Sequence, residues 1–149
     1  MNKEILKRNA IGRFRSGFNC SQSVLSALAV RLDTDVSYLE KVSSGFGGGM
    51  GHMQETCGAV TGSYMAISIY CGNTYADNNE RKEEAYRMIR QFKSEFERIH
   101  KTTICKELIK YELDSPEEHD QAVKENVFED ICEKCICDAV DILDRLLNK

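Results

Sequence analysis

Hydrophobic side chains recur along most of this chain at the three- and four-residue spacing of amphipathic helices, and no stretch alternates as a β-strand does. The clearest run, residues 79 to about 100, has an apolar stripe opposite a charged face. The pattern predicts further helical segments at residues 3–14, 20 to about 32, 36–43, 56 to 70 or 71, 105–109, from 115 onward and 130–147. We therefore expect an all-α fold: one helical bundle of six or seven helices over residues 1–149, with no sheet.

Polar residues at the helix boundaries support this prediction. Asn19 is a favourable N-cap for a helix that begins at Cys20, and Ser115-Pro116-Glu117-Glu118 has the N-cap, the N1 proline and the capping-box glutamate of a helix start. The positive end of a helix dipole favours thiolate over thiol. The cysteines predicted to lie at such helix starts are Cys20, Cys57, Cys105 and Cys132.

A glycine-rich segment, residues 45–51, precedes the helix of Cys57. Its glycines do not have the G-x-G-x-x-G spacing, it follows a helix rather than a strand, and no G-K-S/T occurs, so a nucleotide loop is disfavoured. We interpret it as a backbone path that needs positive φ or close packing and that delivers Cys57 to its helix. The glycines expected near a bound cofactor are Gly47, Gly48, Gly49 and Gly58.

The helix after this segment carries small residues at Gly58, Gly62 and Ala66, every fourth position. An interior glycine costs about 1 kcal/mol relative to alanine. The repeat therefore predicts close approach by another backbone or by a bound group.

Composition and charge narrow the function classes. The 149 residues are 42% hydrophobic and 30% charged, with a single proline, as in an ordinary folded domain. A net charge of -4 with interleaved acids and bases disfavours a nucleic-acid partner. The charged N-terminus lacks the apolar region of a secretory signal, and the longest apolar stretch, residues 59–71, is too short to span a bilayer. We predict a cytoplasmic protein with no membrane partner.

Seven cysteines are many for such a chain, because cytoplasmic thiols are kept reduced and lasting disulfides are rare there. Residues 132–137 contain a CxxC, but no second one follows as in a zinc ribbon. Cys135 shares an apolar helix face and is interpreted as core, Cys71 as packing and Cys137 as exposed. His52 lies in the glycine-rich loop, either as a base, proton donor or ligand near Cys57 or as a surface residue. His100 and His119 are expected to be solvated.

Together these motifs resemble the C_GCAxxG_C_C family of redox-active proteins. The matching stretches are residues 18–24 (FNCSQSV), 44–51 (SGFGGGMG) and 57–62 (CGAVTG), and Cys105 and Cys132 resemble the family's later two cysteines. The resemblance implies a small helical protein that is redox-active or binds a cluster. It gives no support to Cys71, Cys135 or Cys137.

Three hypotheses follow. In the leading one, Cys20, Cys57, Cys105 and Cys132 converge as ligands of a metal centre, most plausibly iron-sulfur, that transfers electrons; four thiolates also suit zinc, which is not redox-active. In the second, the protein holds no metal and Cys57, with Cys20 as the other candidate catalytic thiol, exchanges with a disulfide that a neighbouring cysteine resolves. The third is a non-catalytic helical interaction module. The sequence does not specify the redox partner, and it leaves the oligomeric state open. It is compatible with both an oxidoreductase and an electron carrier.

Overall fold

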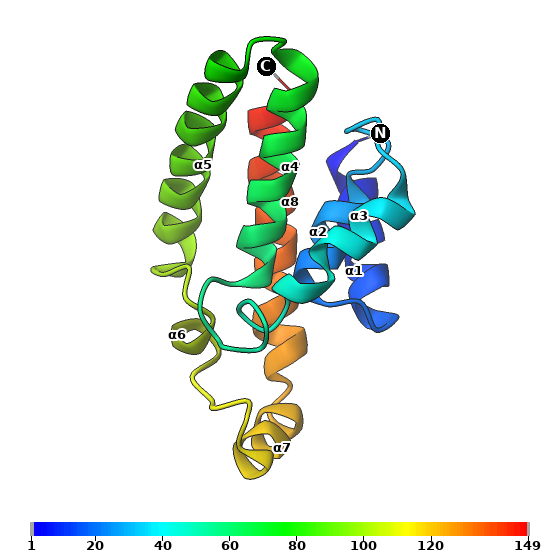
Figure 1. Cartoon of the computed structure of the whole chain (residues 1–149). Helices are drawn as coiled ribbons and strands as arrows, with labels where there is room; N and C mark the ends of the chain where they lie inside the picture. The colour runs from blue at the N-terminus through cyan, green and yellow to red at the C-terminus, as the bar shows by residue number, and fades with distance from the viewer. Residues whose placement is uncertain (1, 149) are drawn as a thin grey trace.

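The computed structural model describes residues 2–148, and its helices are arranged as Figure 1 shows. Eight α-helices form within these residues, against the six or seven expected, because the short segments near residues 105 and 116 each make a separate helix. No strand occurs in the described residues; Thr56 and Ile104 form an isolated antiparallel bridge. The elements are α1 (Lys3–Arg15), α2 (Cys20–Ala27), α3 (Val36–Ser43), the 3₁₀ turn η1 (Ser44–Phe46), α4 (Gly58–Thr74), α5 (Asn78–His100), α6 (Cys105–Ile109), α7 (Pro116–Lys124), the π-helical turn η2 (Phe128–Cys132) and α8 (Glu133–Leu147).

The bundle is built around α4 and α8. These two helices stand side by side, with α5 packed on one flank and α1, α2 and α3 on the other (Figure 1). Their apolar faces meet in one main core, in which Leu25, Ala66, Phe92, Ile136 and Leu143 are fully buried. The all-α class predicted from the hydrophobic spacing is therefore confirmed.

The stripe of small residues on α4 lets α2 approach closely. A Cβ added at Gly62 would lie 2.7 Å from the Ser21 carbonyl oxygen, and one at Gly58 would lie 2.9 Å from the Ser21 nitrogen and 3.0 Å from Cys20 Cβ. The expectation was close approach by another backbone or by a bound group, and the backbone of α2 makes this approach. The contact brings the start of α2, and with it Cys20, against the start of α4.

The glycine-rich loop is fastened to the segment that leads into α6. The backbone N–H of Cys57 donates to the Thr103 carbonyl at 2.7 Å, and that of Cys105 donates to the Glu55 carbonyl at 2.6 Å. The buried side chain of Gln54 donates to the Tyr111 carbonyl at 2.7 Å and accepts from the Leu113 N–H at 2.8 Å. These bonds hold Cys57 and Cys105 side by side.

A second, smaller core lies at the narrow end of the molecule, where α6 and α7 project beyond the main bundle (Figure 1). Its buried side chains are Cys105, Ile109, Leu113, Ala122, Val127 and Cys132. Two of the predicted site cysteines thus belong to this end, while Cys20 and Cys57 belong to the main bundle.

Three predicted boundaries are wrong. The helix expected to end at residue 70 or 71 continues to Thr74. The second helix ends at Ala27 rather than near Leu32, because the backbone turns over residues 28–33. The last helix is preceded by η2, in which the Glu133 N–H donates to the Phe128 carbonyl, so Cys132 lies inside helical backbone and not at a helix start. The prediction of a helix start at Cys132 is therefore wrong.

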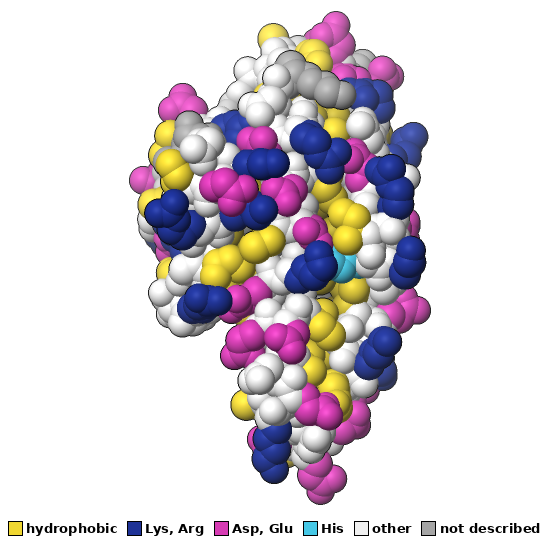
Figure 2. Space-filling model, turned by 180° about the vertical axis from the view of Figure 1, so that it is seen from behind, with side chains coloured by type: hydrophobic (Ala, Val, Ile, Leu, Met, Phe, Trp, Pro, Cys, Tyr) yellow, Lys and Arg dark blue, Asp and Glu magenta, His cyan; other side chains and the backbone are white. Residues whose placement is uncertain are grey.

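Charged side chains of both signs are interspersed on the face seen in Figure 2, as the interleaved sequence implies. Within residues 2–148 no helix has both the length and the apolar character needed to cross a bilayer.

Candidate redox site

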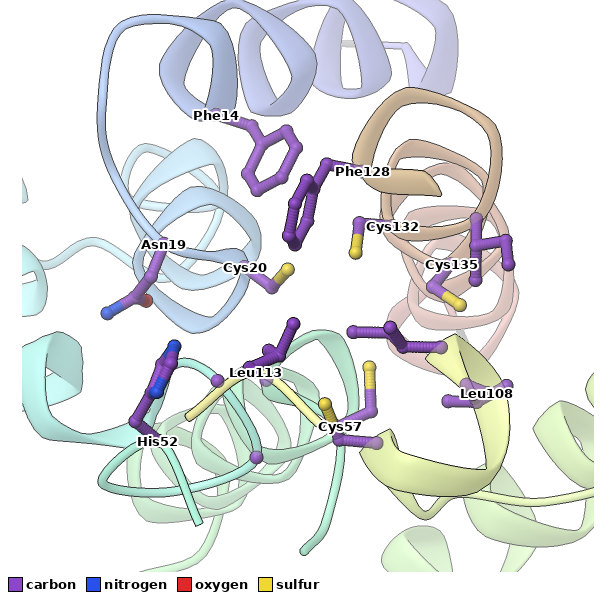
Figure 3. Close-up of a pocket in the computed structure, with 16 residues that line it drawn as sticks. Phe14, Asn19, Cys20, His52, Cys57, Leu108, Leu113, Phe128, Cys132 and Cys135 are labelled. Carbon is purple, nitrogen blue, oxygen red and sulfur yellow. The ribbon is translucent and has the colours of Figure 1, made fainter. Parts of the chain in front are cut away.

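A cavity of about 200 Å³ lies at the seam between the main bundle and the narrow end, and five cysteines line it (Figure 3). They are Cys20, Cys57, Cys105, Cys132 and Cys135. The rest of the wall is largely apolar, including Phe14, Leu108, Leu113, Phe128 and Ile131. The fold thus gathers the four predicted site cysteines around one space, together with a fifth.

Local structure explains how three of these cysteines reach the cavity. Cys20 is the first residue of α2, whose start is fixed by a full capping box between Asn19 and Gln22. Cys57 is the N-cap residue of α4, and Cys105 is the first residue of α6. The predicted helix starts at these three positions are confirmed.

Cys132 and Cys135 come from the other wall. Cys132 is the last residue of η2, and Cys135 lies about one turn further on in α8. Such π-helical turns are rare and are frequently found at functional sites. One turn of helix therefore supplies two sulfurs to the cavity.

The thiols interact in two pairs. Cys20 hydrogen-bonds to Cys132, and Cys57 hydrogen-bonds to Cys135. All seven cysteines are free thiols. Within residues 2–148, no three His, Cys, Asp or Glu side chains stand close enough to hold one metal ion as they lie. The sulfurs therefore surround a volume rather than converge on a point.

A sequence model of the family described as "Putative redox-active protein (C_GCAxxG_C_C)" matches residues 18–146. The chain belongs to the C_GCAxxG_C_C family. No curated protein and no solved structure matches it. All four cysteines that resemble the family's pattern line the cavity, and the fifth cysteine that lines it, Cys135, lies outside that pattern.

Burial and hydrogen bonding shift the pKa values of the cavity thiols of this C_GCAxxG_C_C protein in different directions. The hydrogen bond to Cys132, together with burial, raises the pKa of Cys20 well above its ordinary value. Burial raises the pKa of Cys105 to about 12. A hydrogen bond from Cys135 lowers the pKa of Cys57 despite burial, helped by the backbone N–H groups of Ala59 and Val60, and the same bond raises the pKa of Cys135. The thiolate is thus stabilised at Cys57 and disfavoured at Cys20, Cys105 and Cys135.

A histidine and an aspartate lie behind Cys135, and the sequence analysis assigned neither of them to the site. The Nδ1 of His100 lies 4.0 Å from Cys135 Sγ, and its Nε2 lies 2.9 Å from Asp138 Oδ2. The imidazole also stacks on Phe96, with ring centroids 4.5 Å apart. Only 10% of the His100 side chain is exposed, so the expectation of a solvated histidine is wrong. The reason is that His100, at the end of α5, packs against Cys135 and Asp138 of α8.

The interpretation of Cys135 as core needs correction in one respect. The residue is buried, as expected, and packs in the main core. Its thiol nevertheless faces the cavity and pairs with Cys57. The other two cysteines lie elsewhere: Cys71 is buried with its thiol 3.7 Å from Met88 Sδ, and Cys137 is half-buried beside α1.

The glycine-rich loop forms one rim of the cavity. Gly48, Gly49 and Gly58 line it, whereas Gly47 packs against Asn19, only 2.4 Å from where its Cβ would be. Gly48 and Gly49 have φ of 60° and 75°, which confirms the predicted need for positive φ. His52 also lines the cavity, with its Nδ1 3.3 Å from Asp114 Oδ1 and a side chain 53% exposed. The loop therefore sits between the cysteines and solvent.

Proposed function

We propose that this protein is an electron carrier whose redox group is an iron-sulfur cluster held by the thiolates of Cys20, Cys57, Cys105 and Cys132. The observation that carries the proposal is the convergence of these four cysteines, far apart in sequence, on one cavity. Four thiolates are the ligand set of [2Fe–2S] and [4Fe–4S] clusters. Such a cluster supplies one-electron chemistry that thiols alone do not have.

The shape of the site favours a group with its own volume over a single ion. Four thiolates on one zinc must each lie about 2.3 Å from the same point. In a cluster the four thiolates are shared among two or more irons, so the sulfurs surround a space. About 200 Å³ is ample by comparison with an engineered cavity of ~150 Å³ that accepts benzene. We therefore favour a cluster over zinc.

The surroundings of the cavity suit a buried redox centre. Phe14, Leu108 and Phe128 exclude water from the thiols and lower the local polarity, one of the factors that set cluster potentials. The raised pKa values of Cys20 and Cys105 mean that these thiols stay protonated while no cation is near. A bound metal group reverses this balance, because coordination deprotonates a thiol outright.

Metal analysis with a visible spectrum, on protein purified without oxygen, tests the proposal. We expect brown protein with thiolate-to-iron charge-transfer absorption and stoichiometric iron and sulfide. Serine at each of the four positions should lower the bound iron severalfold. Cys71→Ser and Cys137→Ser are matched controls, because neither thiol lines the cavity, and both should keep the cluster.

Other outcomes would assign the protein differently. Colourless protein with one zinc per chain would make the site a structural metal centre. Protein that takes up no metal after anaerobic reconstitution with iron and sulfide would refute the cluster. If all four serine variants then kept wild-type redox behaviour, a helical interaction module would be the better description.

A further inference from the structure

We propose that the narrow end of the molecule, residues 104–132, and the mouth of the cavity beside it form one docking surface. Its partner is a redox protein with a basic surface around a one-electron cofactor, such as a haem or a flavin. The redox role of the partner rests on the proposed function. The positive charge of the partner does not, because it follows from the charge of the docking surface alone.

The apolar centre of this surface is the mouth of the cavity, formed by Phe14, Cys20 and Phe128. All three residues line the cavity and are only partly buried. Figure 3 shows both phenyl rings on the Cys20 side of the cavity. Of the five cavity cysteines, Cys20 alone is not buried, so the cavity is most accessible there. Protein interfaces have an apolar centre rich in aromatic residues and a polar rim, and the mouth supplies such a centre.

The rim that the narrow end supplies is strongly acidic. Residues 104–132 contain nine acids and three bases, a net charge of -6. The rest of the chain has 15 acids and 17 bases, a net charge of +2. Figure 2 shows acidic side chains gathered over the narrow end. The negative charge of the protein is therefore concentrated in the segment that forms one side of the cavity.

The bases beside the mouth do not cancel this charge, because they already have partners. Arg13 Nη1 lies 3.0 Å from Glu40 Oε1, and Arg15 Nη2 lies 2.7 Å from Glu133 Oε1. Within residues 2–148, by contrast, no ion pair is formed by five exposed acids of the narrow end: Glu117, Asp120, Glu125, Glu129 and Asp130. The charge that this surface offers to a partner is therefore negative.

This distribution of charge selects the class of partner. A second copy presenting the same end, a nucleic acid or an anionic membrane would add negative charge and be repelled. A protein with lysine or arginine around its cofactor is attracted, and such complementarity speeds encounter more than it tightens the complex. Redox partners typically form small, weak complexes of this kind. One electron passes between the two cofactors, and no atom is transferred.

The test measures binding of the full-length protein to cytochrome c, a basic haem protein, by calorimetry. The Kd should rise about tenfold between about 0.01 M and 0.1 M salt, because the Debye length falls from about 30 Å to about 10 Å. Cytochrome c with acetylated lysines should bind about tenfold more weakly at low salt, since its positive charges are removed. Salt-independent binding, or equal binding of the acetylated protein, would overturn the proposal.

A matched pair of double variants tests the position of the surface. Glu125→Gln with Glu129→Gln removes two exposed acids of the narrow end and should weaken binding about threefold. Glu80→Gln with Glu83→Gln removes two exposed acids near the start of α5, at the opposite end of the molecule (Figure 1), and should leave the Kd unchanged. Equal effects of the two double variants would refute the surface, because only the net charge would then matter.

Two further measurements separate the docking surface from the proposed function. In an NMR titration with cytochrome c, the amide signals of Phe14, Cys20 and residues 104–132 should move most, and largest changes in α3 or α5 would overturn the surface. In cluster-loaded protein, the reduced cluster should give one electron to the ferric haem more slowly in the Glu125→Gln/Glu129→Gln variant than in wild type. If the protein holds no cluster, the proposed function and the redox role of the partner fail, while the titration still decides the surface.

Discussion

At the scale of single residues, protonation in the cavity is set by which thiol donates and which accepts. Cys135 donates to Cys57, so the hydrogen bond stabilises the Cys57 thiolate and disfavours a Cys135 thiolate. Cys105 is governed by burial, which disfavours its charged form. These three thiols are therefore chemically distinct, although they share one cavity.

The raised pKa of Cys105 predicts a loss of stability in alkaline solution. The thiol ionises near pH 9 in the unfolded chain and near 12 in the folded protein. Its contribution to folding is therefore complete below pH 9 and is lost as pH rises toward 12. In metal-free protein, denaturant unfolding should show wild type losing stability faster over this range than Cys105→Ser, by up to ~1.4 kcal/mol per pH unit. Parallel pH profiles for the two proteins would contradict this.

Cys135 and His100 show what sequence periodicity leaves undetermined at this scale. Cys135 shares a helix face with Ala139 and Ile142, so its position in the apolar stripe is the same for a core residue and for a cavity residue. Which of the two it becomes depends on where α8 meets α4. His100 has charged neighbours in sequence, but its partner Asp138 is supplied by another helix. Spacing within one helix carries no information on such a pair.

At the scale of elements, the contact between α2 and α4 fixes the positions of Cys20 and Cys57 relative to each other. The Ser21 backbone occupies the space where side chains at Gly58 and Gly62 would stand. The two glycines lower the intrinsic stability of the helix, but they allow α2 and α4 to pack closely. Moving α2 away from α4 would therefore change the distance between Cys20 and Cys57 in the cavity.

Two alanine substitutions in the same helix should have opposite effects. Gly62→Ala places a Cβ 2.7 Å from the Ser21 carbonyl oxygen and should destabilise the metal-free protein by ~1–3 kcal/mol. Gly72→Ala, also in α4, has no atom within 4 Å of its new Cβ and should stabilise by up to ~1 kcal/mol through helix propensity. Urea unfolding of the two variants measures both values. Equal destabilisation would mean that the helix, and not its contact with α2, sets the requirement for glycine.

Helix boundaries were predictable where a local side chain makes the cap. Asp35 accepts from the Tyr38 N–H, and α3 runs over residues 36–43 as its sequence indicates. At Ser115 the cap forms as expected, but Glu118 accepts from the Glu112 N–H instead of completing the capping box. The π-helical turn before α8 has no side-chain cap and no comparable local signal in the sequence. Local chemistry therefore predicts the starts of helices better than their irregularities.

At the scale of the whole molecule, the candidate site lies between two cores of unequal size. The main core draws on α1, α2, α4, α5 and α8, whereas the second core has six buried side chains at the narrow end. Two candidate ligands, Cys105 and Cys132, belong to the smaller core. A group bound in the cavity would join the two parts by covalent links to both.

This division predicts how metal binding changes local stability. In the metal-free protein, amide hydrogen exchange should be fast in residues 104–127 and slow in α4, because few buried apolar contacts hold the small end closed. Binding of the cluster should slow exchange in residues 104–127 at least tenfold, since a ligand that requires the closed form stabilises it by mass action. The middle of α5, which contributes no cavity residue, is the internal reference and should change least. Uniform protection across the chain would indicate that the two cores open as a single unit, and unchanged exchange in residues 104–127 would indicate that Cys105 and Cys132 do not bind the group.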